Sequence, residues 1–213
     1  MNRSIAAMLG QLSGGMIGTI GIFFATLLFS LPLGLLVAFG RMSKIKIIQW
    51  IAKIYISIMR GTPLMLQLMV VYFGPYYIFG IQISASYRLG AVLIAFAINY
   101  AAYFAEIYRG GIESMPTGQY EAARLLGYNK GQTFFRIIFP QVIKRIMPSV
   151  TNEVITLVKD TSLAFSIAYA EMFTTAKQIA SSQTSIIPLV SAGIFYYLFN
   201  LLVAVTMELL EKK

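Results

Sequence analysis

Residues 16–40 read MIGTIGIFFATLLFSLPLGLLVAFG, the most apolar part of an uncharged stretch that extends from Arg3 to Arg41. A helix crosses the ~30 Å hydrocarbon layer of a bilayer in about 20 residues, so this stretch is long enough to span a membrane. The whole chain is similarly apolar, with 58% hydrophobic and 12% charged residues among 213. A soluble domain carries about twice that share of charge. The sequence therefore predicts an integral membrane protein.

Four more apolar blocks follow, each long enough to cross a bilayer. They cover residues 61–87, about 89–108, about 146–170 and about 187–207. Thr62 followed by Pro63 predicts the start of the second span, as an N-cap with proline at the first helical position. The five blocks predict an all-α membrane protein with five transmembrane helices, folded as a single domain over residues 1–213 with its core at about 16–207.

The composition excludes several kinds of chemistry. The chain has no cysteine and no histidine, so it cannot form disulfides, thiol nucleophiles or His/Cys metal sites, and we expect no metal site. The net charge of +9 on so apolar a chain is typical of cytoplasmic loops, and we expect no nucleic-acid partner.

The basic residues are distributed unevenly between the loops. Thirteen lie on one side of the five spans: Arg41, Lys44, Lys46, Lys53, Arg60, Arg109, Arg124, Lys130, Arg136, Lys144, Arg145, Lys212 and Lys213. Only Arg3, Arg88 and Lys177 lie on the other side. Because cytoplasmic loops carry the excess of Lys and Arg, we expect the amino terminus outside and the carboxyl terminus in the cytoplasm.

The longest polar segment, residues 109–145, is then a cytoplasmic loop between the third and fourth spans. Pro116 and Thr117 can start a short helix in it, and Gly127 can end that helix. Such a helix suits insertion into a groove on another protein. The alternative is an interfacial helix lying on the lipid, which its mixed charge and small apolar face disfavour.

The loop also contains a recognisable pattern. Glu121, Ala122, Ala123, Gly127 and Pro140 resemble the EAA loop of binding-protein-dependent ABC importer permeases, although Phe139 stands where that pattern normally has leucine. Three further segments are similar to those of polar amino-acid permeases. They are Arg60-Gly61-Thr62-Pro63-Leu64, Ala105-Glu106-Ile107-Tyr108-Arg109-Gly110-Gly111-Ile112 and Lys159-Asp160-Thr161-Ser162-Leu163.

This resemblance implies the permease subunit of an ATP-driven importer, which moves a polar amino acid across the bacterial cytoplasmic membrane by alternating access. It implies three protein partners: a cytoplasmic ATPase dimer, on which the five EAA-loop residues dock, an extracellular or periplasmic binding protein, and a second permease, identical or paralogous. The chain has no Gly-x-x-x-x-Gly-Lys-Ser/Thr loop, so we expect no enzyme activity or cofactor on it. ATP and magnesium would bind to the ATPase.

Polar residues in the fourth span predict the substrate site. Ser149, Asn152, Glu153, Thr156, Lys159 and Asp160 fall on one helical face. We expect this face to line a cavity while the apolar faces meet lipid, with a break in the helix at Thr161 and Ser162 where transporters commonly bind polar substrates. Lys159 can meet a substrate carboxylate, and Glu153 or Asp160 an ammonium. An internal pair of Lys159 with either acid is the alternative.

Asn99 and Gln67, in the third and second spans, are further substrate candidates, together with Asn152 and Ser162. Gln67 could instead bond a neighbouring helix. Glu106 lies three residues from Arg109, and we expect the two to form an ion pair. Two other functions remain open at this point: an ion-gradient-driven secondary transporter and a non-transporting membrane scaffold.

Overall fold

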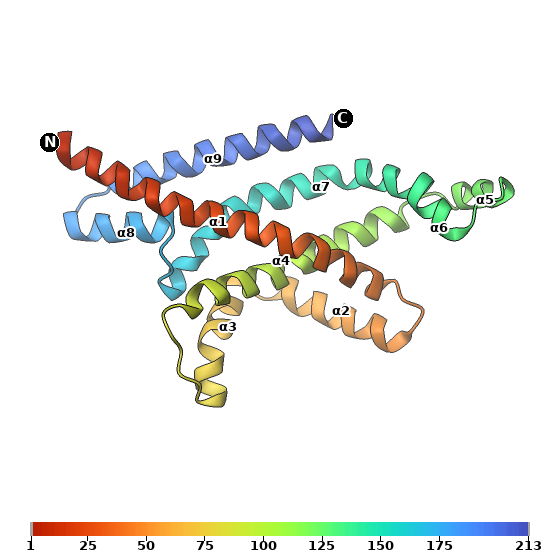
Figure 1. Ribbon diagram of the computed structural model, residues 1–213, viewed down its shortest axis with the longest axis horizontal. Helices are drawn as coiled ribbons and strands as arrows, with labels where there is room; N and C mark the ends of the chain where they lie inside the picture. Colours follow the sequence, from red (N-terminus) through yellow and green to blue (C-terminus); the bar gives the residue numbers. More distant parts are fainter. Residues whose placement is uncertain (1, 213) are drawn as a thin grey trace.

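The computed structural model describes residues 2–212, and in this range it forms helices and no strands (Figure 1). The helices are α1 (Asn2–Arg41), α2 (Lys46–Gly61), α3 (Leu64–Phe79), α4 (Tyr87–Glu113), α5 (Thr117–Leu125), α6 (Lys130–Gln132), α7 (Phe139–Asp160), α8 (Met172–Gln183) and α9 (Ile187–Glu211). A π-helical segment, η1 (Thr133–Ile138), leads into α7, and a 3₁₀ segment, η2 (Thr161–Ile167), continues it.

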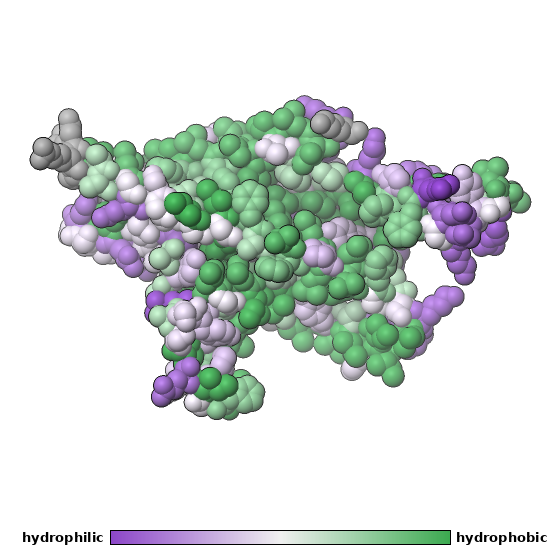
Figure 2. Space-filling model, viewed as in Figure 1, coloured by the Kyte–Doolittle hydropathy of each residue, from purple (hydrophilic) through white to green (hydrophobic). Residues whose placement is uncertain are grey.

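Different helices lie at the two ends of the molecule. In Figure 1, α5 and α6 lie at the right-hand end, towards which the C-terminal end of α9 points, and the amino terminus and α8 lie at the opposite end. Helix α3 projects sideways from the body between these two ends. Figure 2 shows hydrophobic residues over most of the body between these ends and hydrophilic residues gathered around α5 and α6. The long helices therefore connect the two ends through an apolar body, as helices that cross a membrane do.

Several helices have the length and composition of membrane spans, which confirms the prediction of an all-helical fold with several apolar helices. Among the described residues these are Ile5–Arg41, Tyr87–Glu113 and Ile187–Glu211. Helices α2 and α3, bent by 107° at their junction, make a possible fourth span. Helix α7 has 22 residues but carries five charged side chains. The number of spans therefore stays a prediction.

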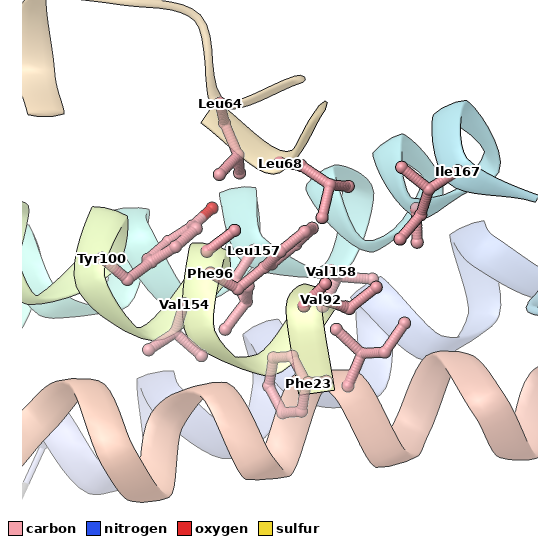
Figure 3. Packing of buried hydrophobic residues seen from close by; sticks show 14 of the residues in the cluster. Phe23, Leu64, Leu68, Val92, Phe96, Tyr100, Val154, Leu157, Val158 and Ile167 are labelled. Carbon is pink, nitrogen blue, oxygen red and sulfur yellow. The ribbon is translucent and has the colours of Figure 1, made fainter. Parts of the chain in front are cut away.

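The core is built around α4. Figure 3 shows side chains of α1, α3 and α7 packed against Phe96 and Tyr100 of that helix. Phe96 and Leu157 are fully buried, and burial of such a side chain contributes roughly 1.5–3 kcal/mol. The apolar faces of α7 were expected to meet lipid. That expectation was wrong for Val154, Leu157 and Val158, which lie inside this core because α4 and α9 cover them.

Two glycines let neighbouring helices close tightly on α4. A Cβ atom at Gly34 of α1 would lie 2.8 Å from the Cβ of Phe104. A Cβ atom at Gly111 of α4 would lie 2.2 Å from the Cγ2 of Ile146 on α7. Both distances are shorter than a van der Waals contact, so a larger residue at either position would clash. Glycine at these positions therefore lets α1 and α7 pack closely against α4.

The junction of α2 and α3 differs from the prediction. Pro63, not Thr62, is the N-cap of α3, and its side chain makes no capping hydrogen bond. The Thr62 hydroxyl instead donates to the Ile58 carbonyl at 2.8 Å, because Thr62 ends α2. The chain therefore turns here between two helices. Residues 41–60 were expected to form the loop between the first two spans, but most of them belong to α2.

Candidate functional site

The polar face of α7 lies on the surface of the chain. Ser149, Asn152, Thr156 and Lys159 are exposed, and Glu153 and Asp160 are partly buried. The predicted alignment of these residues on one side of the helix is therefore present. In the single chain, however, most of this face points outwards.

Asp160 is the last residue of α7, and its carboxylate accepts a hydrogen bond from the neighbouring helix α4. The Tyr100 hydroxyl of α4 donates to its Oδ2 atom at 2.7 Å. Beyond it the helix tightens into η2, which ends at Ala168 in the left-handed conformation, with φ 54°. The Ser162 hydroxyl donates to the Lys159 carbonyl at 2.8 Å. The predicted break at Thr161 and Ser162 is confirmed as a change of helix type.

Lys159 lies close enough to Asp160 for electrostatic attraction, but without the close contact of an ion pair. Among the described residues, Lys159 forms no ion pair with Glu153 or Asp160 within 4.0 Å. Arg60, at the end of α2, lies over the Tyr103 ring, with 5.2 Å from its Cζ to the ring centroid. It also lies close enough to Glu153 for electrostatic attraction. Two acids and two bases therefore gather around the end of α7.

Gln67 and Asn99 form a buried amide pair at the α2–α3 junction. The Asn99 Nδ2 atom donates to Gln67 Oε1 at 2.9 Å and to the Met59 carbonyl at 3.0 Å. The Gln67 Nε2 atom donates to the same carbonyl at 2.9 Å and to that of Thr62 at 3.1 Å. These are carbonyls at the C-terminal end of α2, which lack partners within the helix. The pair therefore fixes the bend.

The predicted ion pair lies near the C-terminal end of α4. The Arg109 Nη2 atom lies 2.6 Å from Glu106 Oε2. This confirms that Glu106 is engaged with Arg109, and so it contributes no free charge to the site at the end of α7.

The predicted loop helix is present as α5. It begins at Thr117 after the N-cap Pro116. It ends with Gly127 at φ +80°, where Gly127 N–H donates to the Arg124 carbonyl and Tyr128 N–H donates to the Ala123 carbonyl, both at 3.0 Å. This pair of bonds is a Schellman motif, which favours glycine at the left-handed position.

Most residues of the EAA pattern are exposed at this end of the molecule. Glu121, Ala122 and Gly127 lie on the surface of the α5 turn, Pro140 is exposed in the first turn of α7, and Ala123 is buried. Leu125 and Leu126 are 90% and 75% exposed. These two leucines were not predicted as contacts, because the sequence pattern does not show that residues 2–212 leave them uncovered.

Sequence reasoning also missed Glu171. This fully buried carboxylate caps α8, accepting hydrogen bonds from Phe173 N–H and Thr174 N–H, both at 2.6 Å, and from the Tyr196 hydroxyl at 2.9 Å. Because Tyr196 belongs to α9, this carboxylate connects the start of α8 to α9. Glutamate is not a preferred N-cap, so its sequence position carried little signal.

The chain was compared with families of known proteins. Residues 30–213 match the family described as binding-protein-dependent transport system inner membrane component. The chain belongs to this family. The EAA-loop residues and the charged end of α7 both lie in the matched range.

Curated relatives of this permease align over nearly its whole length. The arginine transport system permease protein ArtQ of Bacillus subtilis is 35% identical, with 100% of this chain and 98% of that protein aligned. The L-cystine transport system permease protein TcyB of the same organism is 34% identical over 95% of this chain and 86% of its own. The putative glutamine transport system permease protein GlnP of Rickettsia conorii is 35% identical, covering 93% and 90%.

Solved structures show the same arrangement of helices. A chain from the crystal structure of an amino acid ABC transporter with histidines superposes with a TM-score of 0.89 at 33% identity, covering 98% of this permease and 96% of that chain. A chain from the inward-facing MetNI methionine ABC transporter superposes with a TM-score of 0.71 at 17% identity, covering 100% and 98%. The second likeness concerns the fold alone.

Proposed function

We propose that this chain is the permease subunit of an ATP-driven importer that moves a polar amino acid across the bacterial cytoplasmic membrane by alternating access. The family match over residues 30–213 carries this proposal. Its relatives' names add the substrate class, since arginine, cystine and glutamine are all polar amino acids. The chain is a transport component and not an enzyme, and ATP and magnesium bind to the ATPase subunit.

The proposed topology has five spans: α1, the bent pair α2–α3, α4, α7 with η2, and α9. The amino terminus and α8 lie outside, and α5, α6 and the C-terminal end of α9 lie on the cytoplasmic side. The uneven distribution of basic residues supports this orientation. So does Figure 1, where α5 and the start of α2 lie towards one end and α8 towards the other. The chain then forms one transmembrane domain.

The proposed contact with the ATPase is α5 and its flanks. Leu125 and Leu126 are exposed apolar side chains at the tip of a loop, and Glu121 beside them forms no ion pair among the described residues. The two leucines and the nearby carboxylate are suited to a cleft on the ATPase that has an apolar floor and a basic rim. Gly127 sets the angle of the helix end, and Pro140 the start of α7.

The proposed second permease subunit, a copy of this chain or a paralogue, covers the polar face of α7. Ser149, Asn152, Thr156 and Lys159 are exposed on a helix that lies at membrane depth in this topology. Contact with lipid would leave their polar groups without partners at a cost of several kcal/mol each. A water-filled pathway between two subunits satisfies them.

In the proposed substrate site, Lys159 meets the carboxylate, and Glu153 or Asp160 meets the ammonium or a basic side chain. Asn152 and Ser162 supply further hydrogen bonds on the same face. Gln67 and Asn99 hold the bend beside Arg60, where the amide pair forms part of the wall. The binding protein delivers the amino acid at the outer end.

Substrate-stimulated ATP hydrolysis tests this function. The permease is reconstituted with its ATPase and binding protein, and hydrolysis is measured with the binding protein empty and loaded. We expect the loaded binding protein to raise the rate severalfold only when the permease is present. An unchanged rate in the complete complex would contradict the proposal, whereas a scaffold would recruit the ATPase without this response.

A further inference from the structure

The elbow between α1 and α2 holds an unusual combination of side chains. Arg41 closes α1, and α2 begins at Lys46 after a short turn. Between them lies a groove of about 700 Å³. Its lining, which we call the elbow groove, consists of Arg41, Lys46, Ile47, Gln49, Trp50 and Lys53.

The elbow groove has three basic side chains and no acidic one. Among the described residues, neither Arg41, Lys46 nor Lys53 forms an ion pair. A concave surface with three basic side chains and no acidic lining residue attracts an anion, and a phosphate group is well matched because it accepts several charged hydrogen bonds at once.

The rim of the elbow groove is apolar. Trp50 is 65% exposed and Ile47 is 72% exposed, although both are large hydrophobic side chains. Ile51 and Ile54 continue this surface along α2 with 59% and 37% exposure. A soluble phosphate would gain nothing from such a rim, whereas a lipid offers a charged headgroup and an apolar body together.

The position of the elbow groove along the membrane normal fits a headgroup. Arg41 follows the uncharged residues of α1 directly, so it marks where the hydrocarbon layer ends. Tryptophan is enriched at the same level because its ring is amphipathic. In the proposed orientation this level belongs to the cytoplasmic leaflet, where anionic lipids attract basic residues.

We propose that the elbow groove binds the headgroup of an anionic phospholipid from the cytoplasmic leaflet. Arg41, Lys46 and Lys53 contact the phosphate, Gln49 donates to headgroup oxygens, and Trp50 and Ile47 lie against the start of the acyl chains. The lipid fixes the depth of α2, whose other end carries Arg60 beside the substrate site. The inference rests on the proposed orientation, which cysteine labelling at residue 129 tests separately.

Trp50 is the only tryptophan of the chain, so its fluorescence reports contacts at this groove alone. The full chain is reconstituted into phosphatidylcholine vesicles that contain either brominated phosphatidylglycerol or brominated phosphatidylcholine, since bromine quenches tryptophan on contact. We expect the anionic lipid to quench at a several-fold lower membrane fraction, because each basic residue near the surface contributes roughly a fivefold preference.

The variant Lys46→Gln with Lys53→Gln should lower this preference sharply, to the contribution of Arg41 alone. A control variant, Lys130→Gln with Lys212→Gln, changes the net charge by the same amount away from the elbow and should keep the preference. Helix content by circular dichroism verifies that both variants fold. Equal quenching by the two lipids in the native chain would overturn the proposal. An equal loss in both variants would also overturn it, since it would reveal attraction by overall charge. Relief of quenching by soluble glycerol phosphate would identify a free-anion site instead.

Discussion

Lys159 is the residue whose chemistry most needs an explanation outside the single chain. It is exposed, it lies at the end of the polar face of α7, and it makes no ion pair among the described residues. Its nearest acid in sequence, Asp160, accepts from Tyr100. The proposed site therefore uses this exposed base to meet a substrate carboxylate.

We expect Lys159→Met to abolish uptake while the complex still assembles and hydrolyses ATP at its basal rate. Lys159 is exposed and forms no close ion pair among residues 2–212, so folding should be preserved. The double variant Lys159→Met with Asp160→Asn is the comparison, because it restores neutrality. Near-normal uptake of radiolabelled substrate by the double variant would show that Lys159 acts only as a counter-ion.

Asn99 illustrates why residue roles were harder to predict than residue positions. The sequence places Asn99 in an apolar block, and the residue lies within α4, but the sequence does not show that the Gln67 amide and the end of α2 lie opposite it. Tyr100 was missed for the same reason, because its contact with Asp160 joins residues 60 positions apart. Such contacts depend on how helices pack, which the pattern of one helix does not contain.

We expect Asn99→Ala to destabilise the protein. The change leaves Gln67 Oε1 without its donor and removes one from the Met59 carbonyl, and an unsatisfied buried group costs about 1–3 kcal/mol. For a chain of this size that lowers the melting temperature by several degrees. The measurement is thermal unfolding in detergent, with the exposed Asn152→Ala as control. Equal melting of both variants would contradict the structural role of the amide pair.

At the scale of elements, the sequence predicted what turn and break residues encode. Gly127 ends α5 as expected, and Thr161 marks the change from α7 to η2. Helices α2 and α8 were not predicted. The basic residues of α2 concealed its amphipathic period, and α8 is short and polar for a chain in which hydropathy served as the main signal.

We expect Gly127→Val to uncouple transport. Valine is strained at φ +80°, so the Schellman motif opens and the exposed leucines lose their position. Substrate-stimulated ATP hydrolysis should fall to the basal rate, and less ATPase should co-purify. Gly118→Ala is the matched control, since a Cβ there meets open space within 4 Å. Normal stimulation in the Gly127→Val complex would refute the docking role of α5.

At the scale of the whole molecule, the proposed orientation can be tested directly because the chain has no cysteine. A single cysteine at Asn129, between α5 and α6, should react with a membrane-impermeant maleimide only after the cytoplasmic side is opened. A single cysteine at Ser182, on α8, should react in intact cells. The reverse pattern would show that the chain is inserted the other way.

Hydropathy and charge predicted the helical membrane fold because a bilayer constrains composition so strongly. The same signals do not determine the number of spans, since α7 is charged and the pair α2–α3 is bent by 107°. A charged helix at membrane depth is stable only beside polar partners, and in the proposed complex a second permease subunit supplies part of them. The sequence therefore indicates a polar pathway along α7, although most of this polar face is exposed in the single chain.

The measurement that tests the central claim most directly is amino-acid uptake into vesicles holding the permease, its ATPase and the loaded binding protein. We predict accumulation of a radiolabelled polar amino acid when ATP is present on the ATPase side, and none when ATP is omitted or the permease is left out. Accumulation driven by a sodium or proton gradient without ATP would contradict the account.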